Sequence, residues 1–273
     1  MTDRYAVIGH PVKHSKSPQI HTEFARQTGQ DLTYGIVEAP LDGFVTAVKT
    51  FRAEGGKGMN VTAPFKLEAF ALANDASERA RLSGASNALK FDGESIAAEN
   101  FDGVGLVNDV QRNLGYSIRG HRVLLLGAGG AARGVLLPLL AEEPKLLAVA
   151  NRTAAKALAL RQHFAGVGAF AAGGLGEFAH SAFDVVINAT SASLTGEAPA
   201  VPKSCFGAGS LAYEMVYGKG LTPFLALARA SGAARLADGV GMLVEQAAEG
   251  FLWWRGVRPD TRGMIERLTV PLE

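Results

Sequence analysis

The sequence predicts an α/β protein that contains two successive series of strands and helices. Short apolar runs alternate with segments of helical spacing, and the connections between them are short. Glycine is abundant, at 33 of 273 residues, which fits many tight turns between strands and helices. Alternation of this kind is typical of sheets whose faces are covered by helices. A chain of this length can form one large domain or two modest ones.

The first series begins close to the N-terminus. Residues 5–9 form an apolar run that ends in glycine and predicts a strand, and residues 10–18 are expected to form a loop. The spacing then predicts a helix at 19–28, a strand at 32–37, a helix at 44–51 and a strand at 57–62, which stops before Pro64.

The second series begins with a fully apolar run at 122–126. Continuous apolar strands are typical of a parallel sheet that is buried on both faces. Two further helices are expected, one at 102–114 that connects the series and an amphipathic one at 241–254. The pattern predicts the other helices at 132–140, 153–164 and 222–230 and strands at 146–150, 184–188, 210–213 and 234–237.

A glycine-rich motif lies between the first strand and the first helix of the second series. Residues 127–132 match the pattern G-x-G-x-x-A, in which the first glycine permits a tight turn and the second lets the backbone approach a pyrophosphate. This context predicts a Rossmann-type, doubly wound dinucleotide domain. The alternative is a glycine-rich turn without a ligand. The expected phosphate-binding residues are Gly127, Ala128, Gly129, Gly130 and Ala131.

The end of the next strand indicates which dinucleotide is bound. NAD-binding domains usually carry an acidic residue there, whereas this chain has Asn151, Arg152 and Thr153. A guanidinium can grip a 2′-phosphate with charge-assisted hydrogen bonds, and Lys156 lies one helical turn further on. The sequence therefore favours NADP. The alternative is that Arg152 is a solvated surface residue and Thr153 only caps the helix.

Lys66 and Asp102 are candidates for acid–base chemistry. Reduction of a ketone needs a proton donor and positive charge where the alkoxide develops, and a lysine held by an aspartate supplies both. The alternative is that Lys66 is an exposed lysine at a helix start and Asp102 a helix N-cap. The sequence alone does not show that the two residues meet.

Several motifs together resemble those of the shikimate dehydrogenase family, in order along essentially the whole chain. The N-terminal part contributes residues 14–18 with His21, 55–58, 60–62 and 64–66, and Asn100 with 102–105. The later part contributes 127–131, 151–153, 188–191, 238–239, 241–244 and 246–248.

The resemblance implies a fold and an activity. The implied fold is an N-terminal α/β substrate domain and a Rossmann-type NADP-binding domain with a cleft between them. We expect the substrate domain at residues 1–103, completed by helices in 241–273, and the NADP domain at 104–240. The implied activity is the reversible, NADPH-dependent reduction of 3-dehydroshikimate to shikimate in the biosynthesis of aromatic amino acids.

The resemblance also implies roles for individual residues. Lys66 and Asp102 resemble the catalytic pair, and further residues line the nicotinamide end of the cofactor, namely Met215, Tyr217 and Gly239. The serines could otherwise be ordinary turn or cap residues, and Gln246 a polar-face residue of its helix. The implied substrate ligands are Ser15, Ser17, Asn60, Thr62, Asn87 and Gln246.

The chain departs from the family pattern near the proposed site. Phe101 and Ala88 stand where the family usually has threonine, and Glu214 stands where it commonly has aspartate. A bulky ring beside Asp102 could reshape the pocket or admit quinate. The alternatives are therefore a quinate/shikimate dehydrogenase with relaxed substrate or NAD use, and a non-catalytic NADP-binding sensor.

Composition and charge argue against several other kinds of partner and site. The formal net charge of +1 argues against nucleic-acid or membrane partners, and the single cysteine, Cys205, excludes an internal disulfide and a cysteine-based metal site. No apolar run reaches the length of a membrane span and no signal peptide is evident. We expect a cytoplasmic monomer or homodimer that binds small molecules and no metal.

Overall fold

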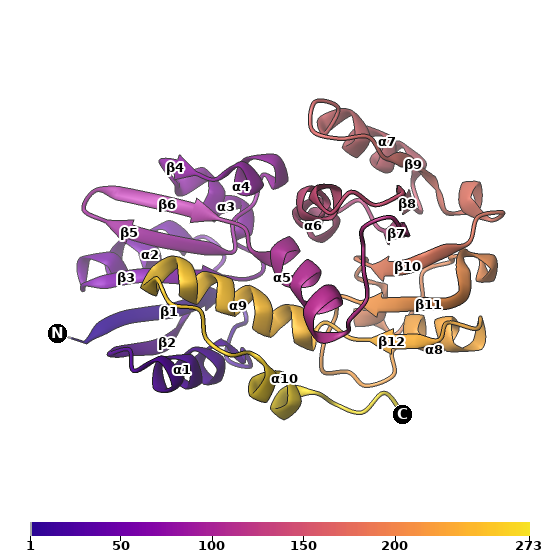
Figure 1. Cartoon of the computed structure of the whole chain (residues 1–273). Coiled ribbons are helices and arrows are strands. Elements are labelled where there is room, and N and C mark those ends of the chain that lie inside the picture. Colours follow the sequence, from indigo (N-terminus) through magenta and orange to yellow (C-terminus); the bar gives the residue numbers. More distant parts are fainter. Residues whose placement is uncertain (1) are drawn as a thin grey trace. The chain divides into compact units, whose positions relative to one another are not determined.

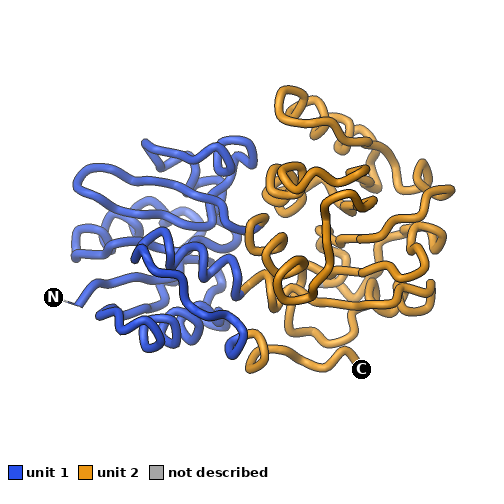
Figure 2. Tube along the Cα trace, in the orientation of Figure 1, with its two compact units in different colours: residues 1–102, 244–264 blue, residues 103–243, 265–273 orange. Residues whose placement is uncertain are grey.

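The computed structural model describes residues 2–273 and divides into two compact units. Unit 1 comprises Met1–Asp102 and Val244–Met264, and unit 2 comprises Gly103–Leu243 and Ile265–Glu273 (Figure 2, blue and orange). Each unit contains one six-stranded sheet with helices packed against it (Figure 1). The predicted α/β class is therefore confirmed.

The sheet of unit 1 is mixed. Its order is β2-β1-β3-β5-β6-β4, in which β1 pairs in parallel with both β2 and β3. The later strand β5 runs antiparallel to β3 and to β6. The strands are β1 Asp3–Gly9, β2 Leu32–Glu38, β3 Gly56–Val61, β4 Asp75–Ala76, β5 Ala88–Asp92 and β6 Ser95–Glu99.

Helices cover both faces of this sheet. Helix α2 (Phe44–Ala53) buries two phenylalanines and helix α3 (Lys66–Leu72) buries Ala69 against one face, where Ile8, Met59 and Leu89 project from the strands. The opposite face packs against α1 (Ser17–Thr28) and α9 (Val240–Arg255), with Tyr5 against Trp254. The segment 66–99 also contains the short helix α4 (Glu78–Ser83).

The sheet of unit 2 is entirely parallel, in the order β12-β11-β10-β7-β8-β9. This is the strand order of a doubly wound dinucleotide-binding sheet. From β7 the chain adds strands first on one side, β8 and β9, and then on the other, β10 to β12, so the strand order reverses between β7 and β10. Residues 123–126 of β7 are fully buried, as the continuous apolar run predicted. The strands are β7 Arg122–Leu126, β8 Leu146–Asn151, β9 Ala171–Gly174, β10 Phe183–Asn188, β11 Phe206–Glu214 and β12 Arg235–Ala237.

Most helices of unit 2 agree with the sequence pattern. They are α6 Gly130–Ala141, α7 Ala154–His163 and α8 Pro223–Ala230. The helix expected at 102–114 is different in kind, because α5 covers only Asp102–Asn108 and a π-helical segment follows at Asp109–Asn113. The buried Asp109 in that segment accepts a 2.7 Å bond from the Tyr213 hydroxyl. Helix α10 (Arg262–Leu268) lies in the segment 241–273, where C-terminal helices were expected.

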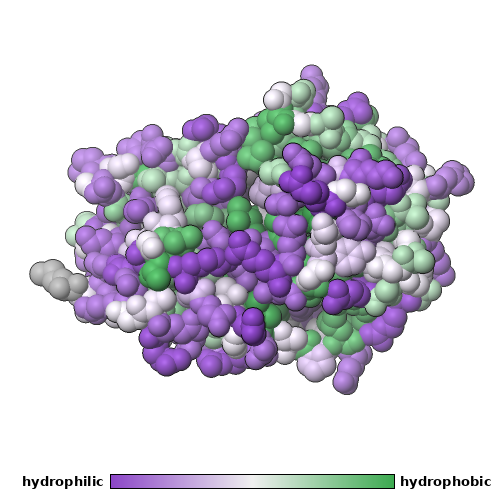
Figure 3. Space-filling view, in the orientation of Figure 1, coloured by the Kyte–Doolittle hydropathy of each residue, from purple (hydrophilic) through white to green (hydrophobic). Residues whose placement is uncertain are grey.

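The face of the molecule shown in Figure 3 is mainly polar. Hydrophilic side chains cover most of the visible face, and hydrophobic groups interrupt them in separate places (Figure 3). Among the described residues, no helix combines the length and the apolar character needed to cross a bilayer.

Candidate active site

Lys66 and Asp102 form a close ion pair. Lys66 is the first residue of α3 and Asp102 the first residue of α5, and the two are 36 positions apart in the chain. The distance from Lys66 Nζ to Asp102 Oδ2 is 2.6 Å. The Lys66 side chain remains 34% exposed and that of Asp102 15%, so the ammonium can still reach a ligand. The structure thus brings together two residues whose meeting the sequence could not show.

Amide side chains hold Asp102 in place. Its backbone N–H donates to Asn100 Oδ1 at 3.1 Å, and its Oδ1 accepts from Asn87 Nδ2 at 2.8 Å. The same Asn87 nitrogen donates to Gln246 Oε1 at 3.0 Å, while Asn87 Oδ1 accepts from the Phe101 N–H at 2.9 Å. Because both N–H groups of Asn87 are engaged within the protein, its side chain supports Asp102 directly.

The loops after β1 and β3 lie at the same edge of the sheet. The His10 N–H donates to the Ala63 carbonyl at 3.0 Å, which ties the two loops together. A Cβ at Gly9 would lie 2.5 Å from Thr62 Cγ2, so only glycine leaves room for Thr62 there. Ser15 and Thr62 both follow these strand ends.

Ser15 and Ser17 interact with each other and neither caps a helix. Ser15 Oγ accepts the Ser17 N–H at 3.2 Å, and the two hydroxyl oxygens are 3.2 Å apart. The N-cap of α1 is Lys16, whose side chain makes no capping bond. The cap role considered for these serines is therefore wrong, whereas Ser15 does stabilise the local turn.

His21 is a buried, neutral residue. It is 1% exposed in an aromatic cluster with Phe24, Tyr34 and Phe251. Neither ring nitrogen has a hydrogen-bond partner within residues 2–273. Burial lowers the pKa of His21 to about 3, against the opposing effect of the nearby Asn60 side chain. The geometry supports a structural role for His21 in the core of unit 1.

Replacing His21 by phenylalanine is expected to leave turnover close to wild type and to change how stability depends on pH. Between about pH 3 and pH 6.5 the unfolded chain binds a proton at His21 that the folded chain does not. The wild type therefore loses about 1.4 kcal/mol of stability per pH unit from this residue as the pH falls through that range. Urea unfolding of both proteins at pH 7 and pH 5 checks this, and identical pH dependences would contradict it.

The glycine-rich loop fits a pyrophosphate. Gly127 follows β7 with a φ of 110°, and a Cβ there would lie 3.2 Å from the Ala189 carbonyl carbon after β10. The loop thus lies where the strand order reverses. Helix α6 has no side-chain cap, and a Cβ at Gly129 or Gly130 would meet no atom within 4 Å. Open space beside free N–H groups at a helix start suits an anion.

The residues at the end of β8 include positively charged side chains and no negatively charged one. Arg152, Thr153 and Lys156 are exposed, and Asn151 Nδ2 donates to the Thr153 carbonyl at 2.9 Å. Thr153 occupies the N-cap position of α7, but its hydroxyl makes no capping bond. These groups fit a 2′-phosphate.

Glu214 organises the strand ends near Met215 and Tyr217. Its fully buried carboxylate accepts bonds from Asn188 Nδ2 at 3.0 and 3.1 Å, from the Ser193 hydroxyl and from the Thr222 hydroxyl at 3.1 Å. Burial raises its pKa, and these donors oppose the shift. In the sequence, Glu214 stands out only as a departure from the family pattern, since an acid at a strand end does not reveal its donors.

Only glycine fits at position 239, which lies against the backbone of Met215. A Cβ there would lie 2.3 Å from the Met215 carbonyl oxygen, so any side chain would force the two segments apart.

Phe101 and Ala88 belong to the buried core. The Phe101 ring is 4% exposed and lies between the Arg79 guanidinium, at 5.6 Å, and the Trp253 ring, at 5.8 Å. Ala88 is completely buried in the same cluster. The expectation that a bulky ring beside Asp102 could reshape the pocket is thus not supported, because the ring packs into the core.

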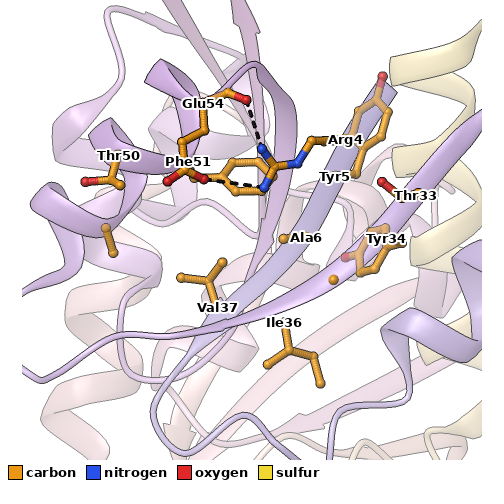
Figure 4. Close-up of a pocket in the computed structure, with 12 residues that line it drawn as sticks. Arg4, Tyr5, Ala6, Thr33, Tyr34, Ile36, Val37, Thr50, Phe51 and Glu54 are labelled. Atoms are coloured by element: carbon orange, nitrogen blue, oxygen red, sulfur yellow. Dashed lines mark hydrogen bonds and ion pairs between the residues drawn. The ribbon is translucent and has the colours of Figure 1, made fainter. Parts of the chain in front are cut away.

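A separate cavity of about 520 Å³ in unit 1 lies at the beginning of β1, against β2 and α2 (Figure 4). Its only charged lining residues, Arg4 and Glu54, pair with each other. It therefore presents no unpaired charge to a ligand. Within residues 2–273, no group of three or more potential ligands is placed to hold a metal ion.

Comparisons with known proteins match successive parts of the chain to one family. Family models match at residues 7–89 (shikimate dehydrogenase substrate binding domain), 109–196 (shikimate/quinate 5-dehydrogenase) and 239–269 (shikimate 5′-dehydrogenase C-terminal domain). A protein of Nitrosospira multiformis, named shikimate dehydrogenase (NADP(+)), is 58% identical over 98% of both chains.

Solved structures are similar as well. An Ael1 enzyme from Pseudomonas putida is 59% identical, with a TM-score of 0.96 over 99% of this chain and 100% of that chain. Shikimate 5-dehydrogenase from Thermus thermophilus, in complex with NADP(H) and shikimate, is 32% identical, with a TM-score of 0.86 over 97% of both chains.

Proposed function

The chain belongs to the shikimate dehydrogenase family, and we propose that it reduces 3-dehydroshikimate reversibly to shikimate with NADPH. Relatives that share more than half of its residues are named NADP-dependent shikimate dehydrogenases. The observation that carries the proposal is the 2.6 Å pair of Lys66 and Asp102, held by Asn87 and Asn100. The enzyme is an oxidoreductase of the shikimate pathway.

Lys66 and Asp102 supply the acid–base chemistry. As the ketone is reduced, negative charge builds on its oxygen, and the Lys66 ammonium stabilises that charge and delivers the proton. Asp102 orients the ammonium through Oδ2 and has lone pairs left to accept a bond from a substrate hydroxyl. Bound NADPH supplies the hydride.

Hydroxyl and amide side chains recognise the substrate. A small hydroxy acid offers one carboxylate and several hydroxyls, and uncharged side chains can bind both. Ser15 and Ser17 bind the carboxylate, and the ring hydroxyls are bound by Asn60, Thr62 and Gln246. Asn87 completes this set as an acceptor, through the second lone pair of Oδ1, while its N–H groups bind Asp102 and Gln246.

Unit 2 holds the cofactor. The loop 127–131 binds the pyrophosphate at the start of α6, and Arg152 and Lys156 bind the 2′-phosphate beside Asn151 and Thr153. Met215, Tyr217 and Gly239 line the nicotinamide end. We further propose that the enzyme acts in the cytoplasm, as a biosynthetic enzyme like its named relatives, and that it is a monomer or homodimer.

Initial rates with shikimate and with quinate, each with NADP and with NAD, test the proposed function. We expect the highest kcat/KM with shikimate and NADP. Higher values with quinate or with NAD would instead indicate the relaxed enzyme. A protein that binds NADP but shows no turnover with any pair would be a sensor.

Replacing Ser15 or Ser17 by alanine is expected to raise the KM for shikimate. Each change removes a hydrogen bond to a charged group, which costs about 1.5–3 kcal/mol. NADP affinity should change little, since neither serine belongs to unit 2. Steady-state kinetics measures both quantities, and unchanged shikimate kinetics in the double variant would place the carboxylate elsewhere.

A further inference from the structure

Tyr34 contacts Asn60 across the middle of the sheet of unit 1. It lies in β2, the edge strand, and Asn60 lies near the end of β3, with β1 between them. The Tyr34 hydroxyl donates to Asn60 Oδ1 at 2.6 Å. Sequence patterns identify Tyr34 only as a strand residue, because an aromatic side chain in a strand normally indicates core.

The orientation of Tyr34 is fixed by its surroundings. Its ring stacks on the buried His21 ring, with centroids 4.3 Å apart and planes inclined by 2°. Burial raises the pKa of Tyr34 well above its usual value, against the opposing effect of the nearby Ser17 hydroxyl. The hydroxyl therefore keeps its proton throughout the physiological range and acts as a donor toward Asn60.

This donor decides which end of the Asn60 amide faces which way. An asparagine side chain has an acceptor oxygen and a donor nitrogen of similar shape, so a neighbouring group must select its orientation. With Oδ1 bound to Tyr34, Asn60 Nδ2 points the other way and lies 3.4 Å from the Asn87 carbonyl oxygen. Asn60 is 5% exposed, so it has few alternative arrangements.

We propose that Tyr34 is a positioning residue for the substrate: it fixes the Asn60 amide so that Asn60 offers an N–H donor to an oxygen of the hydroxy acid. This inference rests on the proposed function, in which Asn60 borders the substrate. It goes beyond the proposed function in two ways. It assigns a role to Tyr34 in the edge strand, and it states that Asn60 acts toward the substrate as a hydrogen-bond donor.

Replacing Tyr34 by phenylalanine tests the proposal with the ring and its stacking retained. The KM for shikimate is expected to rise about 3- to 10-fold, the range for one neutral hydrogen bond, while kcat and NADP affinity stay near wild type. Tyr5→Phe is the matched control. Tyr5 lies in β1 in the register opposite Tyr34, and its hydroxyl contacts Arg255 instead of Asn60. The control should leave the shikimate KM unchanged.

A double-mutant cycle shows whether Tyr34 acts through Asn60. In an Asn60→Ala background, Tyr34→Phe should change the KM and the calorimetric dissociation constant of shikimate by less than twofold, because no amide remains to orient. An unchanged KM in Tyr34→Phe, or the same fold-change in both backgrounds, would overturn the inference. A wild-type enzyme that does not oxidise shikimate with NADP would overturn the proposed function itself, and this is a different result.

Discussion

Replacing Lys66 by alanine is expected to lower turnover with shikimate and NADP by about a hundred- to a thousandfold. Loss of one preorganised electrostatic donor to a developing oxyanion typically has this effect. The Lys66 ammonium interacts more strongly as charge develops, so kcat should fall far more than substrate affinity. Turnover at saturating substrates measures the effect directly.

A matched control separates this effect from a general loss of positive charge. Lys57 is an exposed lysine of β3 in the same unit, and Lys57→Ala should retain wild-type turnover. NADP affinity serves as a folding control for both variants. A Lys66→Ala enzyme with near wild-type turnover would refute the catalytic role of Lys66.

Replacing Arg152 by aspartate is expected to weaken NADP binding strongly and NAD binding much less. The change removes charge-assisted bonds worth about 1.5–3 kcal/mol and adds repulsion between the carboxylate and the 2′-phosphate. NAD has no 2′-phosphate, so it should be largely insensitive. Dissociation constants for both cofactors test this, and equal losses would show that Arg152 does not bind the phosphate.

Arg161→Asp is the control for net charge. Arg161 is exposed in the last turn of α7, whereas Arg152 precedes that helix. The same change in charge at this distance should alter NADP affinity only slightly at physiological ionic strength, because exposed charges are screened.

The strands and helices of unit 2 were largely predictable because short stretches of sequence determine them. A strand buried on both faces is apolar throughout, as in β7, and the turn that follows it needs glycine at 127. The π-helical turn at Asp109–Asn113 was not predictable, since its buried Asp109 is held by Tyr213, 104 positions away. Strand β9 was missed because Ala171–Gly174 has no large apolar residue.

The site of unit 1 was predictable only through family resemblance. Local spacing at Lys66 and Asp102 agrees equally well with an exposed lysine and a helix cap, and their contact depends on how the sheet folds. The bond between Asn87 and Gln246 joins residues 159 positions apart. Tyr34 carries no local signal, because its role depends on Asn60 in a strand that is not adjacent to β2.

The most direct test of the central claim is the turnover of the double variant Lys66→Ala/Asp102→Ala, compared with both single variants at saturating shikimate and NADP. Two residues joined by a 2.6 Å ion pair should act as a unit at the reacting oxygen. The double variant should therefore be little worse than the worse of the two single variants. If the two single losses multiply instead, Lys66 and Asp102 work independently and the paired mechanism is wrong.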